Sequence, residues 1–374
     1  MTGLYLHVPF CVSKCPYCDF YSTDRFDDAL LDRYTDALCA ALDRAAADAH
    51  TTADTLYFGG GTPSLLGGER LARLIDRAAA GFTLSGAEIT LEANPAGDLG
   101  GTLRDFAAAG GNRLSLGMQA ANDGELQTLG RRHRMASLSR AVDAARAAGI
   151  ANLSLDVMLA TPGQTDASVT AAVDTCRALD AQHVSAYLLK IEPGTPFAAR
   201  RDMLALPDED TAADRYLFAC AALEAAGYAQ YEISNFSRPG YESRHNLKYW
   251  NSEPYIGLGP AAHSFFGGRR VYYSRSLPAF LRGEPPLAED ADAPVADGSA
   301  EEYALLRLRL TAGLRADAFA ARFGRPLPDG WRRAAAALPR SLVQSDADGI
   351  RLTREGFLLS TPLTARILEG DDAT

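Results

Sequence analysis

GLYLHVPFCVSKCPYC, residues 3–18, is the stretch that decides how this chain is interpreted. Its first six residues alternate apolar side chains with other types, which is the pattern of a β-strand. Three cysteines then follow at the spacing C-x3-C-x2-C, at positions 11, 15 and 18. The sequence therefore predicts a strand over residues 3–8 that carries a cysteine-bearing loop at its carboxyl end.

The strand pattern recurs five more times further along the chain, each time separated by a helical segment such as 27–49, 69–80 or 139–148. The further strands are expected at residues 54–59, 87–93, 112–117, 152–158 and 182–188. Regular alternation of strand and helix predicts an α/β fold with a parallel sheet and right-handed crossovers. Polar loops follow successive strands, which favours an incomplete parallel (β/α)6 TIM-like barrel over a doubly wound sheet.

The rest of the chain loses this regularity. A helix is expected over 208–226 and a short strand over 228–234, followed by a tract rich in glycine, proline and aromatic residues. Residues 284–297 are the best linker candidate. Beyond them, three helices (301–310, 317–323 and 330–338) and a hairpin turning at Asp348-Gly349 predict a helical, winged-helix-like domain. The expected division is a partial barrel (1–200), a barrel extension and lid (201–290) and a C-terminal helical domain (298–374).

Composition excludes several classes of protein. The chain has 374 residues, with 37 Lys plus Arg against 47 Asp plus Glu, so its formal charge is −10. This charge argues against a protein that wraps nucleic acid. No stretch approaches the roughly 18 to 20 apolar residues of a membrane-spanning helix, and the N-terminus lacks the pattern of a secretory signal. We therefore expect a cytoplasmic protein.

The six cysteines are too few for a disulfide scaffold and are unevenly distributed. Thiolates are the ligands of iron–sulfur clusters, and Cys11, Cys15 and Cys18 on one short loop can hold a cubane whose fourth iron stays open. Zinc is the rival metal, because C-x2-C is a common half-site, but no second Cys or His pair is evident. Three further cysteines fall in apolar helical segments and are expected to pack in the core: Cys39, Cys176 and Cys220.

CVSKCPYC resembles the signature of the radical S-adenosylmethionine superfamily. The resemblance implies that the three cysteines hold one 4Fe-4S cluster and that S-adenosylmethionine chelates the fourth iron. It also places Tyr17 beside the adenine. Gly59 to Pro63 (GGGTP) resembles the glycine-rich motif that contacts the methionine moiety in this superfamily, which implicates Gly60, Gly61 and Thr62.

Polar side chains also follow the later strands, and the carboxyl ends of parallel strands meet at one edge of a sheet. Glu92, Gln119, Asp156 and Glu192 are expected to point toward this rim. The chain further resembles the oxygen-independent coproporphyrinogen III oxidases, a family of porphyrin metabolism. That resemblance implies that five residues line the cofactor cavity: Tyr5, Glu92, Gln119, Arg131 and Asp156.

Two features distinguish this chain from those oxidases. In both features the chain resembles the HemW-type haem chaperones. Phe20 stands where the oxidases have a fourth clustered cysteine, and only ten residues precede the first cysteine. Residues 245–250 match the motif H-N-x-x-Y-W, which provides an imidazole for iron and flat aromatic faces for a porphyrin. The haem-binding candidates are therefore His245, Asn246, Tyr249 and Trp250. His263 is a second imidazole, for which we expect a structural role.

The resemblance implies a haem chaperone with haem b as cargo, acceptor haemoproteins and an electron donor for the cluster as partners, and a homodimer as the expected assembly. We expect no membrane span and no coproporphyrinogen III dehydrogenase activity. The alternative is a coproporphyrinogen III oxidase that uses a 5′-deoxyadenosyl radical for oxidative decarboxylation. The weakest reading is a redox-inert zinc scaffold.

Overall fold

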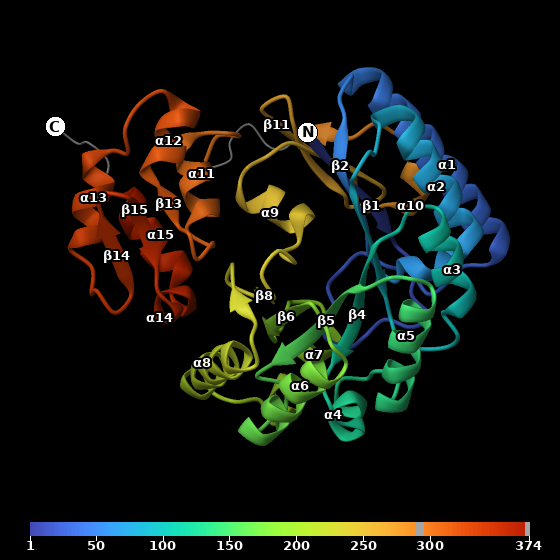
Figure 1. Ribbon diagram of the computed structural model, residues 1–374, viewed down its shortest axis with the longest axis horizontal. Coiled ribbons are helices and arrows are strands. Elements are labelled where there is room, and N and C mark those ends of the chain that lie inside the picture. Colours follow the sequence, from blue (N-terminus) through green and yellow to red (C-terminus); the bar gives the residue numbers. More distant parts are fainter. Residues whose placement is uncertain (289–294, 371–374) are drawn as a thin grey trace.

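The computed structural model describes residues 1–288 and 295–370. Six parallel strands lie side by side in chain order, as Figure 1 shows. They are β1 (Thr2–Val8), β2 (Ala53–Gly60), β3 (Glu88–Ala93), β4 (Arg113–Gln119), β5 (Asn152–Leu159) and β6 (His183–Leu188). The predicted incomplete parallel (β/α)6 barrel is confirmed.

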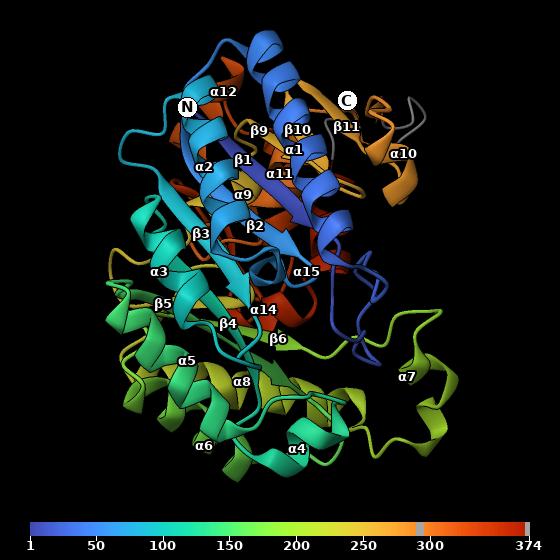
Figure 2. The ribbon, with the colours of Figure 1, turned by 90° about the vertical axis from the view of Figure 1, so that its right-hand side faces the viewer.

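Helices cover the outer face of these strands, as seen in Figure 2. Leu4, Leu6 and Val8 of β1 are fully buried in the core that these helices share. The connecting helices are α1 (Asp28–Ala49), η1 (Pro63–Leu66), α2 (Gly68–Phe82), α3 (Gly100–Ala108), α4 (Asp123–Thr128), α5 (Met135–Ala147) and α6 (Asp166–Ala178).

The inner face of the strands is polar. Successive side chains on a strand point to opposite faces, so Tyr5 and His7 of β1 point away from the helices. The same alternation directs Tyr57, Glu92 and Asp156 toward the interior of the partial barrel. The cavity described below therefore has polar walls, while the apolar core lies between the sheet and its helices.

The segment predicted to form a barrel extension and lid extends the sheet at both edges. After α7 (Pro196–Ala199), η2 (Arg201–Met203) and α8 (Glu209–Ala225), strands β7 (Ala229–Gln230) and β8 (Asn235–Ser237) continue the sheet beyond β6. At the other edge β9 pairs in parallel with β1. The elements of that edge are β9 (Tyr255–Leu258), β10 (His263–Phe266), β11 (Arg269–Tyr272), α10 (Leu277–Leu281) and β12 (Leu287–Ala288).

The H-N-x-x-Y-W motif forms α9 (Arg244–Trp250). This helix lies between the strands of the partial barrel and the C-terminal helices in Figure 1. Its start is fixed to β3, because the backbone N–H of His245 donates to Glu88 Oε1 at 3.1 Å. Since Glu88 is the first residue of β3, α9 lies at the amino-terminal edge of the sheet, away from the cysteine loop.

The C-terminal unit has its own three-stranded sheet, in the order β13-β15-β14. Trp331 and Phe319 are fully buried in its core. The hairpin register pairs Asp346 with Gly349, so the turn residues are Ala347 and Asp348, one position earlier than predicted. Its elements are α11 (Ala300–Arg307), β13 (Leu314–Arg315), α12 (Ala316–Phe323), α13 (Asp329–Ala336), β14 (Val343–Asp346), β15 (Gly349–Leu352), α14 (Arg354–Leu358) and α15 (Ser360–Leu368).

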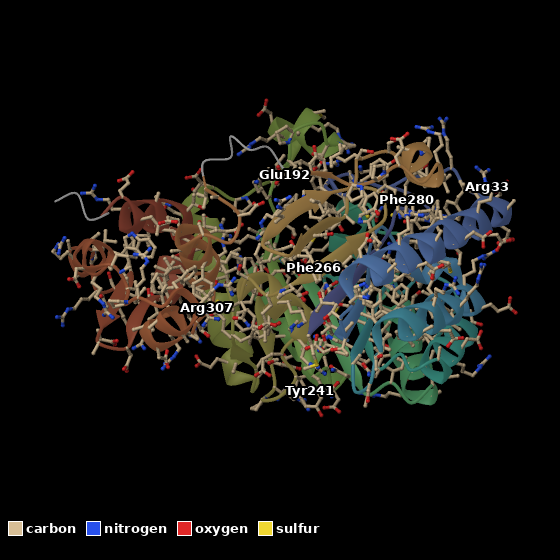
Figure 3. All side chains as sticks on the ribbon, turned by 90° about the horizontal axis from the view of Figure 1, so that it is seen from above. Arg33, Glu192, Tyr241, Phe266, Phe280 and Arg307 are labelled. Carbon is tan, nitrogen blue, oxygen red and sulfur yellow. The ribbon has the colours of Figure 1, made fainter. Side chains whose placement is uncertain are left out.

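Backbone hydrogen bonds join this unit to the barrel. Ile233 N–H donates to Arg309 O at 3.0 Å, and Thr311 N–H donates to Tyr231 O at 3.1 Å. Arg307 contacts Asn251 just beyond α9, on the side of the C-terminal helices nearer the barrel in Figure 3. Part of the predicted linker, residues 289–294, lies outside the described residues, and the domain boundaries stay a prediction. No helix in the described part of the chain is long and apolar enough to cross a membrane.

Candidate functional site

A cavity of about 480 Å³ opens at the carboxyl ends of the barrel strands. It brings together residues that are far apart in the sequence, from the cysteine loop to β5. Eleven of the sequence-predicted residues line it: Cys11, Cys15, Tyr17, Cys18, Gly60, Gly61, Glu92, Gln119, Arg131, Asp156 and Glu192.

Backbone and side-chain hydrogen bonds hold the cysteine loop in place. Cys11 N–H donates to Thr23 O at 3.0 Å, and Thr23 N–H donates to Pro9 O at 2.7 Å, so the loop is closed at its base. Cys18 N–H donates to Cys15 O at 3.1 Å. The three thiols are free and half-buried, and they face the cavity.

This donor set fits an iron–sulfur cubane better than a single metal ion. Among the described residues, no group of three His, Cys, Asp or Glu side chains could hold one ion. A structural zinc needs four ligands that converge on one point, whereas in a cubane each thiolate binds a different iron. Three separate thiols around one cavity therefore suit the cluster.

The glycine-rich turn after β2 lies directly against the cysteine loop. Gly61 N–H donates to Val8 O and Thr62 N–H donates to Phe10 O, both at 2.8 Å. A Cβ at Gly61 would lie 2.7 Å from Phe10 O, so only glycine permits this approach. Thr62 is buried and lies behind the cavity wall, where its hydroxyl is 3.7 Å from Cys11 Sγ. The predicted contact of Thr62 with a cofactor is thereby replaced by support of the first cysteine.

Two half-buried carboxyl groups face the cavity from β3 and β5. Glu92 accepts hydrogen bonds from Tyr57 Oη at 2.7 Å and from Gly60 N at 3.2 Å. Asp156 accepts from Ser115 Oγ at 3.1 Å. Burial, opposed by the Tyr57 hydrogen bond and reinforced by the charge of Asp156, raises the pKa of Glu92 to about 7. Burial raises the pKa of Asp156 to about 6.

Such a pair favours a cationic ligand. A positive charge placed beside the two carboxyls would stabilise their ionised forms and replace the water that burial has removed. S-adenosylmethionine carries a sulfonium and an ammonium group, so the charge of the cavity fits this cofactor.

Arg131 connects the cysteine loop to the sheet. Its Nη1 lies 3.4 Å from both Cys15 Sγ and Tyr17 Oη, and its Nη2 donates to Gly117 O at 3.0 Å. Arg131 also contacts Asn94 Oδ1, and Asn94 Nδ2 donates to Thr62 Oγ1 at 2.8 Å. One guanidinium group thus fixes the second cysteine, the aromatic residue beside it and the β3 loop.

Gln119 has an unusual backbone conformation, with φ of 67°, where β4 leaves the regular ladder with β5. A non-glycine residue in this left-handed region is uncommon and is a feature of functional sites when the surrounding structure holds it. It places the amide on the cavity wall.

Tyr5 lies below the cavity and does not line it, in contrast to the prediction. Its hydroxyl is hydrogen bonded to His7 Nδ1 at 3.1 Å, and its ring stacks on Tyr57 with centroids 6.1 Å apart. Tyr5 therefore supports Tyr57, which in turn holds Glu92.

In this structure neither ring nitrogen of His245, the predicted haem-binding histidine, is free. The side chain is buried, with 1% exposure. Its Nδ1 is 2.8 Å from Thr55 Oγ1 and its Nε2 is 2.7 Å from Tyr249 Oη, so both nitrogens already hold hydrogen bonds. Burial and the nearby charge of Lys248 lower the pKa of His245 to about 3, so the imidazole is neutral.

The other residues of the motif are also engaged within the protein. The Tyr249 ring packs edge-on against Tyr255 at 4.6 Å, and the Arg309 guanidinium lies over the half-buried Trp250 ring at 5.9 Å. Asn246 lines a small polar cavity of about 30 Å³ below the main one. The motif is therefore packed into the amino-terminal edge of the barrel, where Tyr249 and Trp250 are half-buried.

Several cavity residues were missed in the sequence. Asn94, Ser115, Met158 and Tyr187 line the cavity, and Tyr57 lies directly behind Glu92. Tyr57 and Ser115 could have been identified from the alternation of side chains along a strand. Each lies an even number of residues from a position of its own strand that faces the interior of the barrel. Asn94 stands two residues after Glu92, at the strand end where cavity residues are expected.

Comparisons with known proteins agree with this geometry. The family model of the radical SAM superfamily matches residues 5–176, and that of the HemN C-terminal domain matches residues 297–359. The curated heme chaperone HemW of Mycobacterium tuberculosis is 40% identical over 98% of this chain and 94% of its own length. The heme chaperone HemW of Bacillus subtilis is 34% identical over 98% and 99%.

The solved structure of coproporphyrinogen III oxidase (HemN) from Escherichia coli, described as a radical SAM enzyme, is also similar to this chain. It superimposes with a TM-score of 0.82, covering 98% of this chain and 89% of the other, at 22% sequence identity. At this identity the similarity supports the fold alone.

Proposed function

We propose that this chain, which belongs to the family of the heme chaperones HemW within the radical SAM superfamily, binds haem and delivers it to acceptor haemoproteins. The observation that carries the proposal is the match to curated heme chaperones along both the barrel and the C-terminal unit, at up to 40% identity. A match limited to the radical SAM domain would have supported binding of the cluster and its cofactor, but not binding of haem.

The radical SAM family implies a 4Fe-4S cluster and S-adenosylmethionine. We assign the cluster to Cys11, Cys15 and Cys18, whose thiols face the cavity. When bound, the reduced cluster would supply an electron that cleaves the sulfonium of the cofactor. Arg131 is positioned to pair with a carboxylate, and Glu92 and Asp156 are positioned to pair with cationic groups.

The second candidate is an oxygen-independent coproporphyrinogen III oxidase. The fold match to such an oxidase over nearly the whole chain is compatible with it. Phe20 argues against it, because this position lacks the fourth clustered cysteine that the resemblance to the oxidases requires. Phe20 lines the cavity and is 66% exposed, so the mouth of the cavity has an apolar edge at this point.

Haem titration of the anaerobically reconstituted protein, run beside a decarboxylation assay, separates the two functions. The chaperone should bind haem saturably, with a shifted Soret band, and lose it to the apo form of a b-type haemoprotein. Conversion of coproporphyrinogen III to protoporphyrinogen IX, in the presence of S-adenosylmethionine and a reductant, would overturn the proposal. Failure to bind haem would overturn it as well.

Further parts of the proposal follow from the family. We place the protein in the cytoplasm, with an electron donor for its cluster and a homodimer as its assembly. Gel filtration of the reconstituted protein with and without haem tests the assembly, and reduction of the cluster by a candidate flavodoxin-type donor tests the electron supply.

A further inference from the structure

Two cavities inside the barrel share a wall. The cofactor cavity at the carboxyl ends of the strands and the small cavity of about 30 Å³ below it are both lined by Glu92, Ser115, Asp156 and Tyr187. These four side chains come from β3, β4, β5 and β6 in turn. They therefore form one layer of the barrel interior, with the cofactor cavity on one side and the small cavity on the other.

The size and lining of the small cavity suit water. Its volume of about 30 Å³ has room for about two water molecules, since one water needs about 10 to 15 Å³ of such space. All the residues that line it have polar side chains. A buried water needs two to four polar partners. Glu92 and Asp156 provide carboxyl acceptors, and Arg113 provides a guanidinium donor, so the small cavity can hold ordered water.

Hydrogen bonds within the wall of the small cavity leave one side-chain amide for that water. His183 is fully paired, with Nδ1 2.7 Å from Ser154 Oγ and Nε2 2.8 Å from Tyr231 Oη. Ser243 Oγ accepts from the backbone N–H of Asn246 at 3.3 Å. The side-chain amide of Asn246 is half-buried, lines the cavity and has no hydrogen-bond partner in residues 1–288 and 295–370. Because an unpaired amide inside a protein is costly, water in the cavity is its expected partner.

The carboxyl pair has acceptor sites left for the same water. Glu92 accepts from Tyr57 and Gly60, and Asp156 accepts from Ser115. An ionised carboxylate has about four acceptor sites, so each group can accept a further hydrogen bond from below. A water that donates one hydrogen to a carboxylate can donate its other hydrogen to the amide oxygen of Asn246. The water would thus link the helix α9 to the layer that faces the cofactor cavity.

The surroundings of the carboxyl pair make its ionisation sensitive to such a link. Arg113 below the pair and Arg131 beside the cysteine loop are its cationic neighbours, and their charges oppose the effect of burial on the pKa of Asp156. Burial raises the pKa of the surrounding tyrosines and thiol and lowers that of the imidazole, so these groups are uncharged near neutral pH: Tyr5, Tyr57, Cys176, His183, Tyr187 and Tyr249. Within this group of residues, the two carboxyls are the ones that titrate near neutral pH.

We propose that Asn246 is a positioning residue for the cofactor: through water in the small cavity, its amide holds the carboxyl pair of Glu92 and Asp156 ready to receive a cationic group. The inference rests on the proposed cofactor site. It gives one residue of the H-N-x-x-Y-W motif a role in binding S-adenosylmethionine, where the sequence had suggested contact with haem.

Calorimetric titration of the anaerobically reconstituted chain with S-adenosylmethionine, repeated from about pH 5.5 to 8, tests this role. Wild-type affinity should rise with pH as the pair ionises, because a cation favours the ionised carboxyls. Asn246→Leu fills the small cavity and displaces its water. This variant should bind about tenfold more weakly near pH 7, and the midpoint of its rise should move up by about one pH unit.

Two further variants separate this role from a general loss of structure. Asn246→Ser keeps a polar group and leaves room for water, so its midpoint should stay at the wild-type pH. Asn251→Leu removes an amide at the end of the same helix, where Asn251 contacts Arg307 outside the small cavity. Its midpoint should also be unchanged. The titration of the cofactor itself is common to all variants and cancels in the comparison.

The outcomes are distinguishable. If wild type does not bind S-adenosylmethionine, the proposed cofactor site fails, and the inference fails with it. If wild type binds and Asn246→Leu follows the same pH curve, or is weaker by one factor at every pH, the positioning role alone is overturned. Loss of haem binding in Asn246→Leu with unchanged cofactor affinity would also overturn it, because Asn246 would then contact haem. Far-ultraviolet circular dichroism checks that each variant is folded.

Discussion

Each end of the barrel contains a motif that the sequence marks as a candidate site, and the two motifs differ in how far they are available to a ligand. At the carboxyl end, the CVSKCPYC and GGGTP segments leave three thiols facing a cavity of about 480 Å³. At the amino-terminal end, the H-N-x-x-Y-W segment is closed on itself and on the sheet, because His245 is bonded to Thr55 and Tyr249. Residue type marks a candidate, but the hydrogen bonds already made inside the protein decide whether it is available to a ligand.

The amino-terminal end owes its closure to a buried polar network. Glu88 accepts from the backbone N–H groups of Arg244 and His245 and lies 3.8 Å from Arg113 Nη1. Arg113 also donates to Tyr241 O at 3.1 Å. Buried polar groups that are fully paired fix one arrangement, and removing one partner leaves the others unpaired. Mutations at this end should therefore act mainly by lowering the stability of the folded protein.

The largest expected effect is at the carboxyl end. Cys18→Ala should abolish cluster assembly, because two thiolates do not hold a cubane securely. Iron analysis after anaerobic reconstitution should fall from about four iron per chain to near zero.

Cys39→Ala is the matched control for this loss. Cys39 is buried in α1, outside the cavity, so its variant should keep its full iron content. Equal iron in wild type and Cys18→Ala would remove Cys18 from the ligand set.

The next largest effect is at the amino-terminal end. His245→Ala leaves a cavity and two unpaired hydroxyl groups, on Thr55 and Tyr249. The free energy of unfolding should fall by about 3 to 4 kcal/mol, measured by urea denaturation. His50→Ala, at an exposed position, should change it by less than about 0.5 kcal/mol. A His245→Ala protein of wild-type stability that has lost haem binding would restore His245 as a haem ligand.

The pH dependence of the free energy of unfolding tests the carboxyl end of the barrel in the absence of any ligand. The pKa of Glu92 is raised from 4.5 to about 7, and that of Asp156 from 3.8 to about 6. Between about pH 4.5 and 7 the folded state holds protons that the unfolded state has lost, so stability falls as the pH rises. Glu92 alone should account for about 2 to 3 kcal/mol over this window, and Asp156 for about 2 kcal/mol more.

The substitution Glu92→Gln isolates the contribution of Glu92 to this pH dependence of stability. The stability is measured by denaturation of the protein without S-adenosylmethionine. The variant should lose less stability than wild type on going from pH 5 to 7.5. Glu232, whose burial also raises its pKa to about 7, contributes equally to both proteins and cancels in the comparison. Parallel pH curves for the two proteins would show that Glu92 is already ionised at pH 5.

The smallest expected effect is on cofactor affinity. Glu92→Gln keeps the shape of the side chain but removes its charge, so S-adenosylmethionine should bind about tenfold more weakly, or about 1.4 kcal/mol, by isothermal titration calorimetry. Glu209→Gln, an exposed substitution on α8, should leave the affinity unchanged. Unaltered affinity in Glu92→Gln would assign the cationic groups of the cofactor to Asp156 alone.

The sequence predicts the barrel well because its evidence is local. Each strand is a short alternating run and each helix a 3.6-residue periodic one, and the six predicted strands agree with β1 to β6 within one or two residues. The cavity residues follow from the same pattern, since parallel strands bring their carboxyl ends to one edge.

What the sequence did not predict depends on contacts between distant residues. The burial of His245 requires Thr55, 190 residues earlier in the chain, and no local pattern marks that pairing. Thr62 and Tyr5 were predicted to contact the cofactor and instead support Cys11 and Tyr57 from behind. A motif identifies the neighbourhood of a site, and the three-dimensional contacts decide which member touches the ligand.

The pairing of the GGGTP turn with the cysteine loop has a consequence for how the cluster arrives. Gly61 and Thr62 donate backbone hydrogen bonds to Val8 and Phe10, and Thr23 closes the base of the loop. Ordering a free loop would cost about 1 to 2 kcal/mol for each residue fixed. Here part of that entropy is lost through hydrogen bonds made within the barrel itself, so folding of the barrel reduces the entropy that cluster binding must overcome.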